Sequence, residues 1–247
     1  MLNIYKFLLI SLIFFITSSC SLDSRIKKMS LKQRVEMGDK FYKNKKYFKA
    51  IPYYSNIVFE KRSSRTEEIY FRLAICYFKT KKYEDAVFIS QELLSIYPDF
   101  HKEADVLFMI GESYYKISLK AHYTQDETYL SLDAFKKLLA LFPKYHRGKK
   151  VTDYINQLQH KLINKKYYNG YIYFKTYDYP SALLYFDEVI AFNTKDEIHR
   201  KSLYYSSLIH IDRKDIKEAE KVYLFLLKLF PASKETELIK RKLEKNG

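Results

Sequence analysis

The chain has 247 residues and 47% of them are hydrophobic, so it can bury a substantial core, either as one large domain or as a stack of small units. Five glycines and five prolines are too few for a protein rich in turns and strands, which favours helices. A formal net charge of +15 is compatible with binding to nucleic acid, to anionic lipid or to an acidic protein surface.

The first 19 residues have the pattern of an export signal. Lys6 precedes an apolar run from Phe7 to Ile16, which is too short to cross a bilayer as a stable helix. Removing residues 1–19 removes Lys6 and no acid, which leaves a charge of +14. Because an exported protein meets no genome, we expect no nucleic-acid partner and attribute the charge to anionic lipid or an acidic partner surface.

The small residues Thr17-Ser18-Ser19 are followed by Cys20, which resembles the lipidated cysteine of a bacterial lipobox, although Thr17 stands where leucine is usual. Two alternatives are an ordinary cleaved signal with an incidental cysteine and an uncleaved membrane anchor. Cys76, in an apolar helical run, is expected to be buried. With Cys20 lipidated no disulfide can form, and residues 20–29 are expected to be a lipidated polar tether.

Helical spacing of apolar residues begins at Ser30, which forms a capping-box pattern with Gln33, and Ser64 repeats the pattern with Glu67. Two polar turns divide the helical stretches, at Asn44-Lys45-Lys46 and Thr80-Lys81-Lys82. Prolines, which cannot continue a helix, follow aromatic residues at Tyr97-Pro98, Phe142-Pro143 and Phe230-Pro231. The chain is therefore expected to be a series of helix pairs.

An aromatic pair followed by lysine recurs as Phe41-Tyr42-Lys43, Tyr77-Phe78-Lys79, Tyr114-Tyr115-Lys116 and Tyr173-Phe174-Lys175. A small residue lies three positions before it, at Gly38, Ala74, Gly111 and Gly170, and Ser207 is the fifth of this set. A second small residue opens the next helix, at Ala50, Ala86, Ser131, Ala182 and Ala219, and a large residue follows four positions later except at Ser90. This combination resembles the tetratricopeptide repeat, a helix–turn–helix unit of about 34 residues.

The resemblance implies an all-α tetratricopeptide-repeat solenoid of about five repeats over residues 30–231, within a domain of residues 30–247. Repeat three carries eight extra residues around Leu119 to Thr128, since Ser131 lies 20 residues after Gly111 whereas Ala50 lies 12 after Gly38. Residues 148–176 contain no stop signal and are expected to form one long helix. A further helix is expected at 178, with Pro180 in its first turn, and a capping helix at 233–245.

Residues 134–192 resemble more closely the BamD family of outer-membrane assembly lipoproteins. The similarity rests on Ala134-Phe135, Leu138, Phe142-Pro143, Tyr167-Tyr168, Ala182-Leu183, Tyr185-Phe186 and Val189-Ile190, and on the order of lipobox, tether, repeats, insertion and C-terminal helix. Thr194 replaces the proline of the fourth repeat. The resemblance implies a lipid anchor on the periplasmic face of the outer membrane, and partners that include a BamA-type insertase, other assembly lipoproteins and C-terminal peptides of unfolded outer-membrane proteins.

No arrangement of residues predicts catalysis. The six histidines are scattered without metal-ligand spacing, and there is no glycine-rich phosphate loop or nucleophile elbow. Asp126 and Glu127 fall in the insertion and are expected to be solvated. We therefore expect a protein that is not an enzyme and has no cofactor besides the lipid on Cys20.

The first helices of stacked repeats line a concave face, which is the expected peptide-binding groove. Its candidate residues are Val35, Asp39, Tyr42 and Lys43 in repeat one, Phe71, Ile75, Phe78 and Lys79 in repeat two, and Phe108, Glu112, Tyr115 and Lys116 in repeat three. The rings either contact a peptide or pack between neighbouring helices. The lysines either neutralise the terminal carboxylate of a substrate or lie at helix C-termini to complement the dipole.

Two functions remain open. The first is a lipid-anchored scaffold of the machinery that assembles β-barrel proteins in the outer membrane. The alternative is a periplasmic repeat adaptor for cell-wall enzymes or for another envelope complex. An enzyme attached to the solenoid would need a separate catalytic domain, for which residues 232–247 leave no room.

Overall fold

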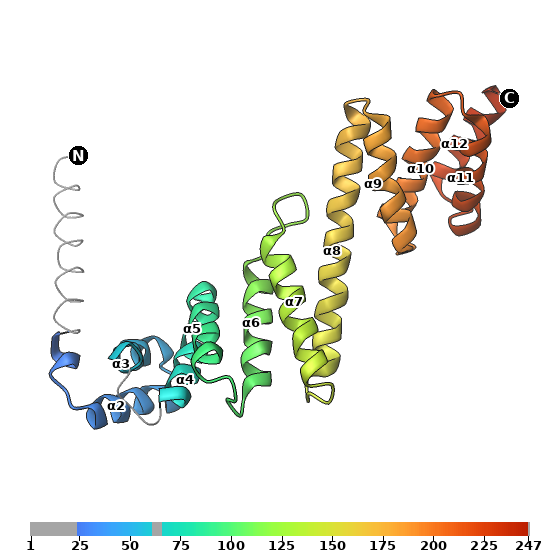
Figure 1. Ribbon diagram of the computed structural model, residues 1–247. Helices are drawn as coiled ribbons and strands as arrows, with labels where there is room; N and C mark the ends of the chain where they lie inside the picture. The colour runs from blue at the N-terminus through green and yellow to red at the C-terminus, as the bar shows by residue number, and fades with distance from the viewer. Residues whose placement is uncertain (1–23, 61–65, 247) are drawn as a thin grey trace, which may run out of the picture. The chain divides into compact units, whose positions relative to one another are not determined.

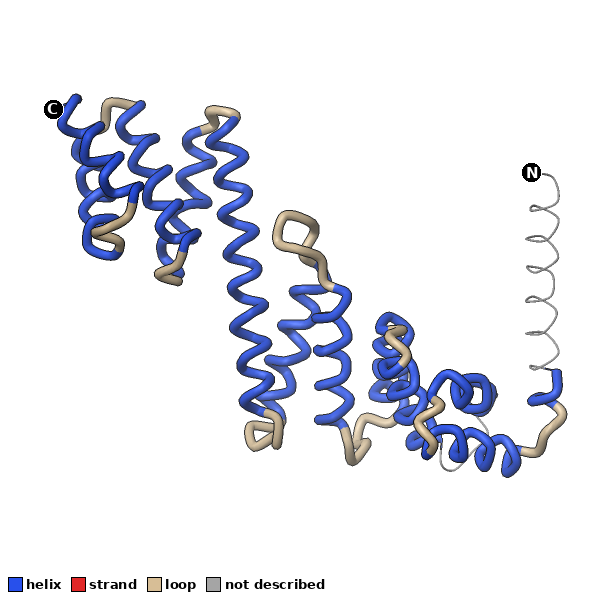
Figure 2. The backbone as a smooth tube through the Cα atoms, turned by 180° about the vertical axis from the view of Figure 1, so that it is seen from behind, coloured by secondary structure: helices blue, strands red, loops and turns tan. Residues whose placement is uncertain are grey.

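A computed structural model describes residues 24–60 and 66–246 (Figure 1). Within these ranges the chain is helical and contains no strand (Figure 2). The expected signal, Cys20 and the Ser64 cap lie outside the described residues. No helix of the described part combines the length and the apolar character needed to span a bilayer.

The described chain divides into two compact units, and the N-terminal unit contains residues up to Ile117 together with Asp133–Gly148. Its helices are α2 (Leu31–Lys43), α3 (Tyr47–Glu60), α4 (Thr66–Lys79), α5 (Tyr83–Ile96), α6 (Glu103–Ile117) and the greater part of α7 (Asp126–Leu141). Each helix from α2 to α6 packs against the next, which is the arrangement expected of consecutive helix pairs. The expected stops are confirmed, since α5 and α7 end immediately before Tyr97-Pro98 and Phe142-Pro143.

The C-terminal unit comprises Ser118–Leu132 and the residues from Lys149 onward. Its helices are α8 (Gly148–Lys175), α9 (Tyr179–Phe192), α10 (Glu197–Asp212), α11 (Ile216–Leu229) and α12 (Lys234–Asn246). The long helix, the helix beginning with Pro180 in its first turn and the terminal helix are all confirmed. Helix α12 packs against α10 and α11 through the buried side chains of Thr236 and Ile239, and it closes the stack as a capping helix.

The two helices of a repeat cross at the small residue of the first helix. An added Cβ at Gly111 would lie 2.6 Å from the buried ring of Phe135. The same contact pairs Gly38 with Tyr54 at 2.7 Å and Gly170 with Phe186 at 2.9 Å. Repeat two, by contrast, has Ala74 in the small position and the small residue Ser90 in the large one, both fully buried. The small side chain of Ser90, where the other repeats have a large residue, therefore leaves room for the extra methyl group of Ala74.

The turns within repeats one, two, four and five share a Schellman motif. The second turn residue adopts a left-handed conformation, at Lys45, Lys81, Tyr177 and Lys214, with φ between 57° and 62°. The next N–H donates to the carbonyl oxygen of the first residue of the aromatic triplet, as in Lys46 to Phe41 and Lys82 to Tyr77, both at 2.9 Å. The polar turns expected at 44–46 and 80–82 are thus confirmed, but their left-handed conformation was not anticipated, because glycine usually occupies such a position.

The first expected helix begins at Leu31, and the capping box at Ser30 is confirmed, with Ser30 Oγ accepting from the N–H of Gln33 and the Gln33 side chain accepting from the N–H of Ser30. Residues 24–27 nevertheless form one helical turn before it, and the side chain of Ile26 is only 1% exposed. Part of the segment expected to be a tether is therefore folded.

The loop of the insertion covers residues 118–125 and ends earlier than expected, because α7 already begins at Asp126. Asp126 and Glu127 thus lie in the first helical turn of α7, where acidic residues complement the helix dipole, and not in the loop. The side-chain amide of Gln125, which is buried, donates to the carbonyl oxygens of Lys120, Tyr123 and Thr124 at 2.9 to 3.0 Å. One glutamine therefore holds the loop closed.

Two lysines of α8 fasten the same loop to that helix. Lys161 donates to the hydroxyl of Ser118 at 2.7 Å, and Lys165 donates to the carbonyl oxygen of His122 at 3.2 Å. Partial burial lowers the pKa of Lys161, which the nearby Glu127 partly opposes. The insertion is accordingly an ordered part of the C-terminal unit.

Replacing Gly111 with alanine tests the crossing contact. The added methyl group collides with Phe135, whose ring is fully buried, so we expect the free energy of unfolding to fall by about 1–2 kcal/mol despite the higher helix propensity of alanine. Gly148→Ala is the matched control, because no atom lies within 4 Å of its added Cβ. Thermal denaturation followed by circular dichroism measures the stability of both variants. Equal stability of the two variants would contradict the packing argument.

Candidate peptide-binding surfaces

The twelve candidate groove residues all lie on α2, α4 and α6 in the N-terminal unit. Lys43, Lys79 and Lys116 are exposed, and the other candidates are half-buried with one exception. Phe108 is only 3% exposed, because Phe135 and Tyr145 contact its ring and the guanidinium of Arg147 lies 4.9 Å from its centre. The expectation that Phe108 presents an accessible ring is therefore wrong.

Three of the remaining rings, those of Tyr42, Phe71 and Phe78, contact another aromatic residue while part of their surface stays open. Tyr42 lies edge-on to Tyr47, with ring centres 5.7 Å apart, and Phe78 lies edge-on to Tyr83 at 5.5 Å. Phe71 packs against Phe100 at 5.5 Å. These contacts fix the orientation of the rings, so a bound peptide would meet a preformed surface and lose less entropy on binding.

An ion-pair network joins the first three helices of the unit. Asp39 accepts hydrogen bonds from Arg72 at 2.5 Å and from the hydroxyl of Tyr54 at 2.8 Å. Glu68 forms an ion pair with Arg72 at 3.5 Å and accepts a hydrogen bond from Lys102 at 3.0 Å. The candidate Asp39 is thus engaged within the protein, where it joins α2 to α3 and α4.

Burial shapes the protonation of this network. Burial raises the pKa of Tyr54, and its hydrogen bond to Asp39 raises it further, so the phenol stays a donor at physiological pH. Burial disfavours the charged form of Arg72, but the hydrogen bond and charge of Asp39 outweigh this and raise the pKa of the guanidinium. Tyr54 therefore remains a hydrogen-bond donor and Arg72 remains charged at physiological pH.

The three lysines end the first helices of repeats one to three, at or next to the last residue of α2, α4 and α6. Among the described residues, no carboxylate lies within ion-pair distance of Lys43 or Lys79. This position complements the negative end of each helix and also leaves the ammonium groups open to a ligand. The geometry is compatible with both interpretations of the lysines.

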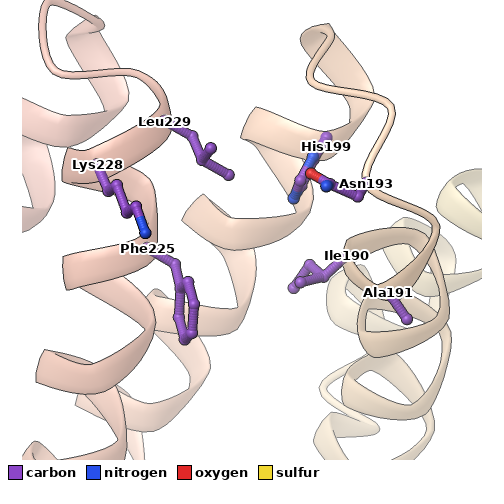
Figure 3. Close-up of a pocket in the computed structure, with 7 residues that line it drawn as sticks. All are labelled: Ile190, Ala191, Asn193, His199, Phe225, Lys228 and Leu229. Atoms are coloured by element: carbon purple, nitrogen blue, oxygen red, sulfur yellow. The ribbon is translucent and has the colours of Figure 1, made fainter.

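Two pockets were not anticipated from the sequence. The α3 pocket, of about 540 Å³, lies in the N-terminal unit and is lined by Phe41, Phe48, Lys49, Ile51, Pro52, Tyr53 and Lys82. The α9–α11 pocket, of about 350 Å³, lies in the C-terminal unit and is lined by Ile190, Ala191, Asn193, His199, Phe225, Lys228 and Leu229. Figure 3 shows the α11 side chains facing Ile190 and His199 across this second pocket.

His199 is the one ionisable side chain of the α9–α11 pocket that is buried. Its Nδ1 accepts a hydrogen bond from the N–H of Lys195 at 3.2 Å, and its ring lies edge-on to Phe230 at 5.9 Å. Burial lowers the pKa of His199, although Asp196 opposes this shift. A neutral imidazole is therefore favoured, with a structural role at the α9–α10 turn.

The second helices α9 and α11 carry several exposed apolar side chains. They are Leu184 at 62%, Phe192 at 46%, Leu224 at 62%, Phe225 at 52% and Leu227 at 38% exposure. Isolated exposed apolar residues are common on protein surfaces, but several on neighbouring helices are typical of an interaction site. A signal existed in the sequence, since Leu183-Leu184 and Leu226-Leu227 supply apolar residues beyond one amphipathic face.

Comparison with known proteins gave one family match. Residues 68–99 match the tetratricopeptide-repeat family model, and these residues span most of α4 and all of α5. No curated protein sequence gave a significant match.

Several solved structures are similar in fold. The TPR2AB-domain:pHSP90-complex of yeast Sti1 is 15% identical, covering 87% of this chain and 83% of that chain, with a TM-score of 0.46. Pseudomonas aeruginosa pilF is 17% identical over 86% of this chain and 82% of its own, with a TM-score of 0.38. A tetratricopeptide repeat protein from Parabacteroides merdae is 15% identical over 87% of this chain and 74% of its own, also with a TM-score of 0.38.

Replacing Asp39 with asparagine tests the ion-pair network. Arg72 loses its carboxylate partner in a site where both side chains are less than one third exposed, so we expect a loss of about 1–3 kcal/mol in the free energy of unfolding. Glu237→Gln is the control, because its pair with Arg241 is more than half exposed and should contribute less than about 0.5 kcal/mol. Urea denaturation measures both, and a similar loss in the two variants would show that the network contributes no more than a surface pair.

Proposed function

We propose that this chain, an array of tetratricopeptide repeats, is a lipid-anchored scaffold in the assembly of outer-membrane β-barrel proteins. The observation that carries the proposal is the repeated surface of the N-terminal unit, where first helices present half-exposed rings beside lysines that end each helix. Helical arrays of this kind are protein-binding scaffolds, because stacked first helices form an extended surface.

The resemblance to the BamD family supports the finer assignment. Three of the features on which it rests are present in the fold: the long helix α8, the insertion before α7 and the terminal helix α12. The insertion is ordered by Gln125 and fastened to α8 by Lys161, which is what a defined structural feature requires. A generic repeat array needs neither an ordered insertion nor its attachment to α8.

The two units suit two classes of partner. In the N-terminal unit, Lys43 and Lys79 would neutralise the terminal carboxylate of an unfolded outer-membrane protein, and Tyr42 and Phe78 would contact its alternating apolar side chains. In the C-terminal unit, the exposed apolar side chains of α9 and α11 would dock a BamA-type insertase. Neither role requires catalysis.

Photo-crosslinking in cells tests these assignments. Phe78 packs against Tyr83, so the crosslinking residue is better placed at its exposed neighbour Lys79. We expect adducts with newly exported outer-membrane proteins from position 79 and with a large barrel protein from position 224. The control position is Lys240 on α12, which is exposed and outside both surfaces.

Adducts at either position with a peptidoglycan hydrolase or synthase, and none with barrel proteins, would overturn the proposal. That result would favour the alternative of an adaptor for cell-wall enzymes. Recovery of the protein only in inner-membrane fractions would also contradict the outer-membrane assignment.

The lipid anchor is tested by Cys20→Ser. This variant should fold normally but appear in the soluble fraction, because the acyl chains supply the membrane affinity. Cys76→Ala is the matched control and should stay membrane-bound, since Cys76 is fully buried in the core. Cell fractionation with a high-salt wash measures both. If the Cys20 variant remains on the membrane after that wash, the lipid is not the anchor.

A further inference from the structure

We propose that the α3 pocket is a second peptide-binding site, which takes a bulky apolar side chain flanked by acidic residues. The pocket uses a different side of α2 from the groove. Phe41, which lines it, contacts Tyr53, whereas the neighbouring Tyr42 contacts Tyr47, Tyr54 and Arg72. The site is therefore additional to the groove of the proposed function and does not depend on it.

The pocket has an apolar interior with a defined shape. Tyr53 is only 7% exposed and forms its base, with the ring of Phe41 5.7 Å away at an interplanar angle of 32°. Phe48 is 70% exposed and stands at the rim. The volume of about 540 Å³ falls within the range of roughly 300–1,000 Å³ typical of ligand sites. An aromatic or large aliphatic side chain fits such a space.

Lysines surround this interior. Lys49 and Lys82 line the pocket, and Lys45, Lys46 and Lys81 are exposed in the two adjacent turns. The ammonium group of Lys82 lies 5.9 Å from the ring centres of both Phe48 and Tyr77, which brings the two turns together. The acidic residues of the next helical turn are Glu84 and Asp85, so positive charge predominates. An acidic ligand complements this rim.

Pro52 removes one hydrogen-bond donor from the backbone of α3 beside the pocket. It is the sixth residue of α3, and it has no N–H to donate to the carbonyl oxygen of Phe48 four residues earlier. Both residues line the pocket. A bound segment with its own N–H near the inserted side chain can supply the missing donor.

The carbonyl oxygen of Phe48 distinguishes a peptide from a membrane surface. A peptide carries the N–H, the apolar side chain and a neighbouring carboxylate at fixed short spacings, and all three have a counterpart in the pocket. Anionic lipid head groups satisfy the lysines, but their acyl chains remain in the bilayer and do not enter a pocket whose base is Tyr53. The observations therefore favour a peptide.

The test uses the purified protein and an array of heptapeptides with blocked ends. The central residue is phenylalanine, leucine or alanine, and its neighbours are glutamate, glutamine or lysine. Blocked ends remove the terminal carboxylate, so binding in the groove of the proposed function does not interfere. We expect glutamate-flanked phenylalanine and leucine peptides to bind at least about tenfold more tightly than lysine-flanked or alanine-centred ones.

Charge reversal assigns that binding to the pocket. Lys49→Glu combined with Lys82→Glu should weaken it by about tenfold or more, whereas Lys136→Glu combined with Lys137→Glu makes the same charge change on α7, outside the pocket and the groove, and should alter it by less than about threefold. All four lysines are exposed, so folding is not at risk. Phe48→Ala, also at an exposed position, should weaken binding without charge change.

Three results would overturn the proposal. One is the absence of any peptide that binds above the alanine-centred background. A second is equal weakening by the two double substitutions, which would indicate general electrostatic attraction. The third is that Lys49→Glu with Lys82→Glu abolishes binding to vesicles of phosphatidylcholine and phosphatidylglycerol at about two to one while leaving peptide binding unchanged.

Discussion

The fold depends on the close approach of two helices at one small residue in each repeat. Where that residue is Gly38, Gly111 or Gly170, the facing helix fills the space with the ring of Tyr54, Phe135 or Phe186. These rings are fully buried, so they are the fixed points about which each helix pair is built. Glycine inside a helix normally costs about 1 kcal/mol, and the close contact with a large ring offsets this cost.

This constraint also determines what each helix can present to a partner. Once Tyr54 occupies the crossing point, its hydroxyl reaches Asp39, and Asp39 in turn holds Arg72 of the next repeat. The core residue thereby orders the polar network between the first two repeats. On the same helix, Tyr42 stays half-buried and Lys43 exposed. The packing of one repeat and its polar contacts with the next are therefore linked through a single side chain.

The helices and the crossing positions could be predicted from the sequence because they depend on residue size at a fixed spacing, which a repeat makes visible. The left-handed turns could not, since Lys45, Lys81 and Lys214 carry none of the glycine signal that usually marks this conformation. The order of the insertion also escaped prediction, because a single polar residue, Gln125, holds the loop through backbone carbonyl groups. A contact of this kind does not recur at a fixed spacing in the sequence, so no repeat pattern reveals it.

The candidate binding residues also depend on contacts between separate segments of the chain, which helical spacing does not predict. Helical spacing predicted that Phe71 on α4 and Phe108 on α6 both face the groove. In the structure, the turn after α7 brings Tyr145 and Arg147 over Phe108, and Phe108 is buried. The α3 pocket arises likewise from two segments, because Lys82 belongs to the second repeat and Phe48 to the first. A motif search within one repeat cannot find a site that two repeats share. In a stacked array, new binding surfaces therefore arise most readily where the turns of successive repeats meet, and sequence signals for them must be sought in pairs of repeats.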